Sequence, residues 1–150
     1  MPFDLNLVEA QLALNLIGTT DLPKLAWDAL EAGLDGPATR RLAALRFPTI
    51  FEVREVLPKA MQEWQIAELP PAQAAVRLAK HRARQILQTN DDPLKHTGDF
   101  AQIWRETDYC AELSDYGDLD DEVYVARYSG QTDDQIRQWL RQKLQALADS

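Results

Sequence analysis

Hydrophobic residues recur at steps of three and four along most of the chain, which is the spacing of one face of an α-helix. The clearest example is residues 68–88, where small and aliphatic side chains line one side and basic side chains line another. This pattern predicts an amphipathic helix with one face toward a core. Its predicted core-facing residues are Ala72, Ala75, Val76, Ala79, Ala83, Ile86 and Leu87.

The same spacing predicts further helices on both sides of this segment. They cover residues 7–17, 22–33, 37–45, 47–66, 99–110 and 133–147. Residues 120–128 fit a helical turn, although their valines and tyrosines would also suit an extended strand. Pro58 removes a backbone donor and disfavours helical geometry at Leu57, so we expect a kink or two short helices near residues 57–58.

Residues typical of helix ends support these boundaries. Thr20 or Asp21 can cap the first turn of the second helix, and Gly33 suits a left-handed C-terminal cap. Pro48–Thr49 is a typical helix entry, and Thr132 is a strong N-cap for the last helix. Most helix starts and stops can therefore be predicted from local chemistry.

The chain shows no internal repeat of fixed period and no linker that would separate domains. Its 150 residues and 45% hydrophobic content are sufficient for one buried core. We therefore predict an all-α fold, a single compact domain over residues 1–150 with seven to eight short helices packed as an orthogonal bundle.

Two stretches of the chain resemble a group of small all-helical bacterial proteins of uncharacterised function. The first has the form D-L-P-x-L-A-x-D-A-L-E-x-G over residues 21–33, and the second is a basic R-L-A…A-R-x-I-L helix closed by D-P-L at residues 92–94. The similarity covers roughly residues 20–105. It implies a helical bacterial fold and assigns no catalytic residue.

The net charge of −8 argues against nucleic-acid binding, which relies on a surplus of Lys and Arg. Residues 108–122 contain seven acids and no base, whereas the rest of the chain has 17 acids and 16 bases. Nearly all of the excess negative charge therefore lies in this one stretch.

The composition also favours a reducing compartment, because Cys110 is the only cysteine. The amino-terminal residues carry acids and lack the basic region of a signal peptide. Their apolar run is shorter than the ~20 residues that a membrane span needs. We therefore expect a cytoplasmic protein without membrane association.

Catalytic and metal-binding motifs are not recognisable. Cys110 would need His81 or His96 as a base, and its acidic surroundings disfavour the thiolate that a nucleophile requires. A calcium loop starting at Asp118 would have Val123 in place of its glycine. The sequence thus predicts no catalytic residue, no metal site and no cofactor.

A basic face is predicted on the helix at residues 68–88. Arg77, Lys80 and Arg84 share one side of it. They can be solvated, pair with the acidic stretch, or bind a ligand, and the first two are the usual roles of such a face.

Residues 108–128 hold all four tyrosines together with the seven acids, and we call them the acidic tyrosine segment. Tyrosine gives a large contact area with few torsions to fix, and carboxylates speed encounter with basic proteins. The candidate partner-binding residues are Tyr109, Glu112, Asp115, Tyr116, Asp118, Asp120, Asp121 and Tyr124. As the alternative, Tyr124 and Tyr128 lie one turn apart and can pack on the core.

These observations favour a non-catalytic bacterial protein that binds a basic protein partner. An immunity or antitoxin-like inhibitor, which covers the basic cleft of a toxin, is one form of this function. The competing hypothesis is an enzyme or small-ligand binder with a pocket assembled from dispersed residues between helices. Trp64, His81, Trp104 and Arg105 would line such a pocket.

Overall fold

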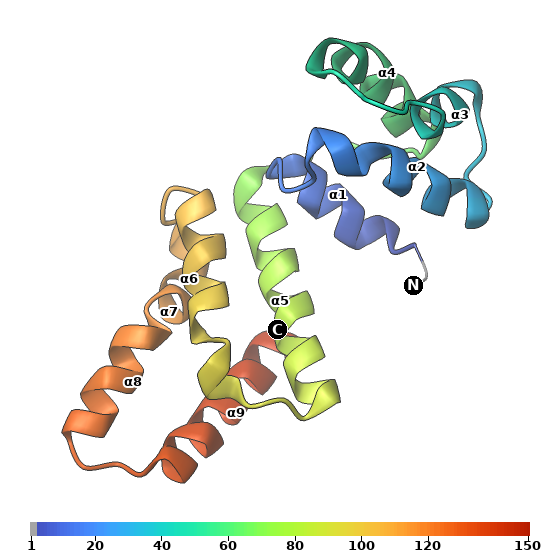
Figure 1. Cartoon of the computed structure of the whole chain (residues 1–150). Coiled ribbons are helices and arrows are strands. Elements are labelled where there is room, and N and C mark those ends of the chain that lie inside the picture. The colour runs from blue at the N-terminus through green and yellow to red at the C-terminus, as the bar shows by residue number, and fades with distance from the viewer. Residues whose placement is uncertain (1–2) are drawn as a thin grey trace. The chain divides into compact units, whose positions relative to one another are not determined.

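The computed structural model describes residues 3–150, and over these residues the chain is all-α (Figure 1). It contains nine α-helices and three short 3₁₀ turns there, and no strand. The all-α prediction is confirmed, with close to the expected number of helices. The chain divides into two compact units, residues 1–69 and residues 70–150. The single-domain prediction stays a prediction, because this division does not decide whether the units unfold together.

Four helices form the first unit (Figure 1). They are α1 (Leu5–Ala13), α2 (Leu22–Glu31), α3 (Pro37–Ala43) and α4 (Ile50–Glu63). Their apolar faces meet in one core, in which α3 packs against both α2 and α4. The buried core residues are Leu22, Ala26, Ala29, Ala38, Leu42, Ala43, Val53, Val56, Ala60 and Trp64.

Local sequence signals set most helix ends of this unit. Gly33 has a φ of 89°, which is the predicted left-handed C-cap. Thr49 caps α4 in a capping box with Glu52. The side-chain cap predicted at the start of α2 is wrong for Asp21, which is the N-cap residue but makes no capping hydrogen bond. Asp21 follows a 3₁₀ turn and has helical backbone angles, whereas capping side chains sit on extended backbone.

Helix α4 runs without a break from Ile50 to Glu63 and includes Pro58. Of the two alternatives expected near residues 57–58, the division into two short helices is therefore wrong, and the kink stays a prediction. Pro58 removes one hydrogen bond of the ladder, but the Thr49 capping box and the burial of Val53, Val56 and Ala60 stabilise the helix on both sides of it.

A polar cluster joins α3 to the end of α4 inside the first unit. The Glu63 carboxylate accepts hydrogen bonds from the backbone amides of Ala38 (2.9 Å) and Thr39 (2.8 Å). It also accepts from the Thr39 hydroxyl (2.7 Å), which in turn accepts from the indole N–H of the buried Trp64 (3.0 Å). Glu63 therefore caps a helix that is 24 residues distant in sequence. Gly36 leaves room for it, because a Cβ there would lie 2.3 Å from Glu63 Cδ.

Five helices form the second unit (Figure 1). They are α5 (Pro71–Thr89), α6 (Thr97–Glu106), α7 (Ser114–Gly117), α8 (Leu119–Tyr128) and α9 (Asp133–Asp149). Helix α5 packs against α9 and α6, and α6 packs against α7 and α8. The strand alternative for residues 120–128 is therefore wrong, because these residues lie within α8.

Small residues allow these helices to approach closely. The buried residues of α5 include Ala75, Ala79 and Ala83, as predicted, but also Ala74 and Leu78. Ile86 is buried as predicted too, whereas the remaining predicted core-facing residues of this helix, Ala72, Val76 and Leu87, are only half-buried. The buried face of α5 is therefore rotated slightly from the prediction.

Gly117 marks the closest approach in the second unit. It ends α7 and is buried beneath the indole of Trp104, on α6. A Cβ at this position would lie 2.1 Å from two ring carbons of Trp104. Helix α9 begins where predicted, since Thr132 caps it in a capping box with Gln135.

Candidate binding surface

The acidic tyrosine segment starts with a tight turn after α6. Asp108 and Tyr109 both have positive φ, 51° and 60°, which reverses the chain at this point. The turn folds around Trp104, whose indole N–H donates to the Cys110 carbonyl at 2.9 Å. The Tyr109 ring packs edge-on against the Trp104 ring, with a centroid distance of 5.1 Å. The start of the segment is therefore anchored through Trp104.

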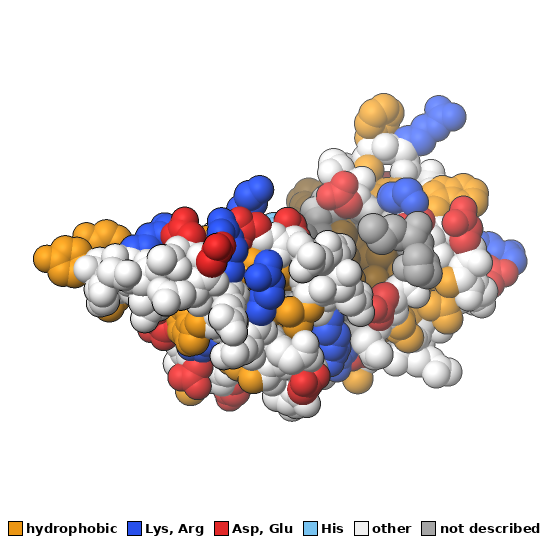
Figure 2. Space-filling model, turned by 90° about the horizontal axis from the view of Figure 1, so that it is seen from below, with side chains coloured by type: hydrophobic (Ala, Val, Ile, Leu, Met, Phe, Trp, Pro, Cys, Tyr) orange, Lys and Arg blue, Asp and Glu red, His pale blue; other side chains and the backbone are white. Residues whose placement is uncertain are grey.

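Three of the four tyrosines are exposed. Tyr109 is 57% exposed, Tyr124 is 71% exposed and Tyr128 is 87% exposed, while Tyr116 is half-buried. The alternative that Tyr124 and Tyr128 pack on the core is therefore wrong. The C-terminal end of α8 lies at the left end of Figure 2. Hydrophobic side chains, drawn in orange together with tyrosine, project there.

The acids of the segment differ in their surroundings. Glu122 forms an ion pair with Lys143 of α9 at 3.1 Å. Asp120 accepts a hydrogen bond from the Thr97 hydroxyl. Asp118 is half-buried, and its Oδ1 is buried without a hydrogen-bond partner. Glu122 and Asp120 are therefore held by residues of neighbouring helices, whereas Asp118 is only partly buried.

The remaining acids of the segment point to solvent. They are Asp108, Glu112, Asp115 and Asp121. Across residues 3–150, Glu122 is the one acid of the segment that pairs with a lysine or arginine. The carboxylates are therefore mostly available to another molecule.

A groove of about 540 Å³ runs between α8 and α9 and opens to solvent. Its wall from α8 carries acids and small apolar residues, and its wall from α9 carries Trp139 and Lys143. The lining residues are Asp118, Asp121, Glu122, Val125, Ala126, Ser129, Gln131, Trp139 and Lys143. The groove brings together two predicted binding residues, Asp118 and Asp121, with residues that sequence reasoning did not include.

Lys143 shows how this groove holds a cation. Its Nζ lies 3.1 Å from the Glu122 carboxylate, 5.2 Å from the centroid of the Trp139 ring and 5.6 Å from the centroid of the Tyr116 ring. Both ring distances are in the range of cation–π attraction. Trp139 and Lys143 lie four residues apart on α9, which was the one available sequence signal for this pairing.

Two residues of the predicted basic face bind backbone oxygens at the C-terminal end of α9. Lys80 Nζ donates to the Ser150 backbone oxygen at 2.7 Å, and Arg84 donates to the Ala148 carbonyl at 3.1 Å. Cations stabilise the C-terminal carbonyls of a helix through its dipole. Of the acidic tyrosine segment, Glu112 lines a shallow groove of about 420 Å³ with Arg77, Lys80 and Arg84.

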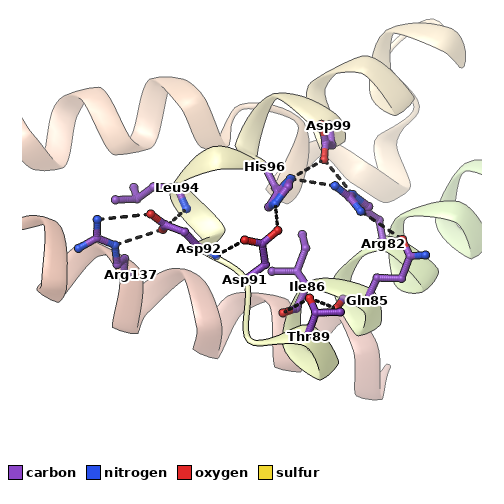
Figure 3. Close-up of polar contacts among 10 residues, drawn as sticks. All are labelled: Arg82, Gln85, Ile86, Thr89, Asp91, Asp92, Leu94, His96, Asp99 and Arg137. Atoms are coloured by element: carbon purple, nitrogen blue, oxygen red, sulfur yellow. Dashed lines mark hydrogen bonds and ion pairs between the residues drawn. The ribbon is translucent and has the colours of Figure 1, made fainter.

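A second polar cluster lies at the corner between α5 and α6 and surrounds His96 (Figure 3). The ring Nε2 is 2.6 Å from Asp91, and Nδ1 is 2.8 Å from the Arg82 guanidinium and 3.1 Å from Asp99. Because a guanidinium only donates, the Arg82 contact has Nδ1 accept and Nε2–H donate to Asp91. Asp99 then accepts from Arg82 at 2.8 Å, and its approach to Nδ1 is not a hydrogen bond. The hydrogen bond from His96 lowers the pKa of Asp91 below its ordinary value.

Arg137 of α9 extends this corner (Figure 3). Its guanidinium bonds Asp92 at 3.1 Å and Asp134 at 2.9 Å, and the Asp92 contact lowers the pKa of that carboxyl. The corner joins three helices through side chains and leaves His96 mostly buried. In the described part of the chain, no group of three His, Cys, Asp or Glu side chains is arranged to hold a metal ion.

The structure also locates residues of the dispersed-pocket hypothesis. Trp64 is 1% exposed and its indole N–H is already bonded to Thr39. It cannot line a ligand pocket without leaving the core. Trp104 likewise donates its indole N–H to Cys110.

No helix within residues 3–150 combines the length and the apolar character that crossing a membrane would require. Comparisons with protein families, curated proteins and solved structures find no match to this chain.

Proposed function

We propose that this chain is a non-catalytic, cytoplasmic bacterial protein that binds a basic protein partner through the acidic tyrosine segment. One observation supports the proposal most directly: Tyr124 and Tyr128 are 71% and 87% exposed on α8, within a segment that carries solvent-exposed carboxylates. Exposed aromatic side chains that lie next to one another form the kind of patch that often marks a protein–protein interaction site.

The charge distribution supports the same function. The exposed carboxylates of the segment create a negative field that attracts a basic surface and repels an acidic one. The exposed rings then supply contact area once the two surfaces meet, at low cost in side-chain entropy. The acids thus contribute encounter rate and selectivity, and the tyrosines contribute affinity.

An immunity or antitoxin-like inhibitor is the specific role that we favour within this function. Such a protein must bind a basic cleft tightly and needs no catalytic residue of its own. The separation of a well-packed α5–α9 pair from an exposed α8 surface suits this role, because the binding surface can vary without disturbing the core.

The experiment is capture of partners from native lysate with the whole chain, followed by mass spectrometry. Tyr124→Ser with Tyr128→Ser should lower capture at least about tenfold, which corresponds to the loss of one interface hot spot. Phe47→Ser with Phe51→Ser is the matched control, because these rings are also four residues apart and 90% and 78% exposed.

The proposal expects captured proteins to be basic and to dissociate as ionic strength rises from about 0.1 M to about 1 M. Equal capture by the tyrosine variant and the wild type would refute it. Loss of capture in the phenylalanine variant alone would move the interface to α4.

A further inference from the structure

The groove between α8 and α9 carries an excess of negative charge. Its lining contains three carboxylates (Asp118, Asp121 and Glu122) and one ammonium (Lys143), which gives a net charge of −2. Glu122 is neutralised by Lys143, but Asp118 has a buried Oδ1 without a donor. The groove is therefore complementary to a ligand with about two positive charges.

The groove also has an apolar part. Val125, Ala126 and Trp139 line it beside the acids, and Val125 is exposed although it is fully aliphatic. A volume of about 540 Å³ accommodates one or two large side chains. Because the groove is open along its length, it suits a peptide segment better than a metabolite, which needs enclosure on most sides.

The acids are placed for a planar cation. Asp118 is the N-cap of α8 and Asp121 is three residues further along the same helix. Residues with this spacing share one helix face. A guanidinium presents several donors in one plane and can bond two carboxylates at once, which an ammonium does less well.

We propose that the α8–α9 groove is the subsite that recognises the partner, and that it binds a protein segment in which a large apolar residue is flanked by arginines. This inference rests on the proposed function. The apolar side chain occupies the space between Val125 and Trp139, and an arginine bonds Asp118 and Asp121. Lys143 stays paired with Glu122 and lies between this arginine and the Trp139 ring.

A blocked peptide, Ala-Arg-Leu-Arg-Ala, tests this subsite directly. It is titrated into the ¹⁵N-labelled whole chain, and the indole N–H of Trp139 and the amides of Val125 and Ala126 are followed by NMR. We expect saturable shifts at these positions with a dissociation constant of about 1 mM, as befits a five-residue ligand. The lysine analogue should bind more weakly, and the glutamate analogue should cause no saturable shift.

Two pairs of substitutions with the same change in charge localise the effect. Asp118→Asn with Asp121→Asn should weaken peptide binding about tenfold, equivalent to about 1.4 kcal/mol. Asp118 makes no capping hydrogen bond to α8, so α8 should stay intact in this variant. Glu112→Gln with Asp115→Asn lies in the same segment but outside the groove, and should change binding less than about twofold.

Equal weakening by both pairs would show that only the overall charge matters, and it would overturn the subsite. So would the absence of a saturable shift at Trp139. The proposed function is tested separately by partner capture. Capture that depends on Tyr124 and Tyr128 but not on Asp118 and Asp121 would retain that function and remove the groove from it. Peptide binding in the groove without capture of any basic protein would retain the subsite and contradict the proposed function.

Discussion

The two units place their polar contacts differently. In the first unit, one carboxylate, Glu63, lies between α3 and α4 and bonds two amides and a hydroxyl next to the buried Trp64. In the second unit, the polar contacts lie at corners and along half-exposed helix faces, as at His96 and at Lys143. The first unit therefore depends on polar chemistry inside its core, whereas the second uses it to fasten the edges of an apolar core.

The exposed aromatic pairs show a parallel difference. Phe47 and Phe51 in the first unit are purely apolar, while Tyr124 and Tyr128 in the second carry hydroxyls among carboxylates. A hydroxylated ring tolerates water while free and still gives contact area when covered. This difference is why we place the partner surface on the second unit.

Gly117→Ala should give the largest loss of stability. The new Cβ would lie 2.1 Å from the Trp104 ring, so either α7 or the indole must move. We expect a loss of about 3 kcal/mol in the free energy of unfolding, as for overpacked cores. Chemical denaturation followed by circular dichroism measures it.

Gly98→Ala is the matched control for this prediction. Its Cβ would meet only Asp120 Oδ2 at 3.6 Å, an ordinary contact, and alanine favours the helix more than glycine. The control should be unchanged or slightly more stable. If Gly117→Ala behaves like Gly98→Ala, then Trp104 does not fix the start of the acidic tyrosine segment.

Glu63→Gln is the corresponding test of the first unit, with a smaller effect. The amide group would set a donor against the backbone N–H groups of Ala38 and Thr39, so we expect a loss of about 2 kcal/mol. Gly36→Ala should act similarly by displacing the Glu63 side chain. Glu55→Gln on the exposed face of α4 is the control and should leave the free energy of unfolding unchanged.

The pH dependence of unfolding sharpens this prediction. Burial acts to raise the pKa of Glu63, but the hydrogen bonds from Thr39 and Ala38 outweigh it, so the pKa lies below its ordinary 4.5. The stabilisation is complete above pH 4.5 and is lost as pH falls through the lower pKa of the folded state. The Glu63→Gln protein should therefore lose less stability on acidification than the wild type. An equal acid-induced loss would contradict the role given to Glu63.

These two variants also test whether the chain is one domain. If residues 1–150 unfold as one domain, as the sequence predicts, Gly117→Ala and Glu63→Gln will each lower the protection of amides in both units, measured by hydrogen exchange. If each variant affects only its own unit, the chain has two independently stable parts, and the comparison of the units becomes a comparison of domains.

Local signals in the sequence were sufficient for much of the fold. The caps at Thr49 and Thr132 and the left-handed Gly33 depend on residues within one turn, so they could be predicted. The continuity of α4 through Pro58 could not, because packing of the helix on the core outweighs the local preference. Local propensity therefore gives helix ends more reliably than helix interiors.

Contacts between helices were outside the reach of sequence reasoning. Glu63 caps a helix 24 residues away, and Lys143 pairs with Glu122 across 21 residues. The concentration of acids and tyrosines was visible in the sequence, but not the groove that gathers three of the acids. Nothing in one sequence specifies which helices become neighbours, and this neighbour relation creates the groove.

His96→Ala should have a smaller and more local effect on the second unit. Since the hydrogen bond from His96 is the main reason that the pKa of Asp91 is low, this pKa should rise toward its ordinary 3.8. The pKa of Asp92, lowered mainly by Arg137, should stay low. Carboxyl-detected NMR titration measures both. A parallel rise at Asp92 would mean that the whole corner, including the Arg137 contact, depends on His96.

The double variant Tyr124→Ser with Tyr128→Ser should have the smallest effect on stability. Both rings are exposed, and serine and tyrosine have similar helix propensities, so the free energy of unfolding should change by less than about 0.5 kcal/mol. Phe47→Ser with Phe51→Ser should change it equally little, measured by the same denaturation. A loss above about 1 kcal/mol in the tyrosine variant alone would show that the phenols stabilise α8. Their exposure would then be no argument for a partner, because side chains that the fold itself requires need no second molecule to account for them.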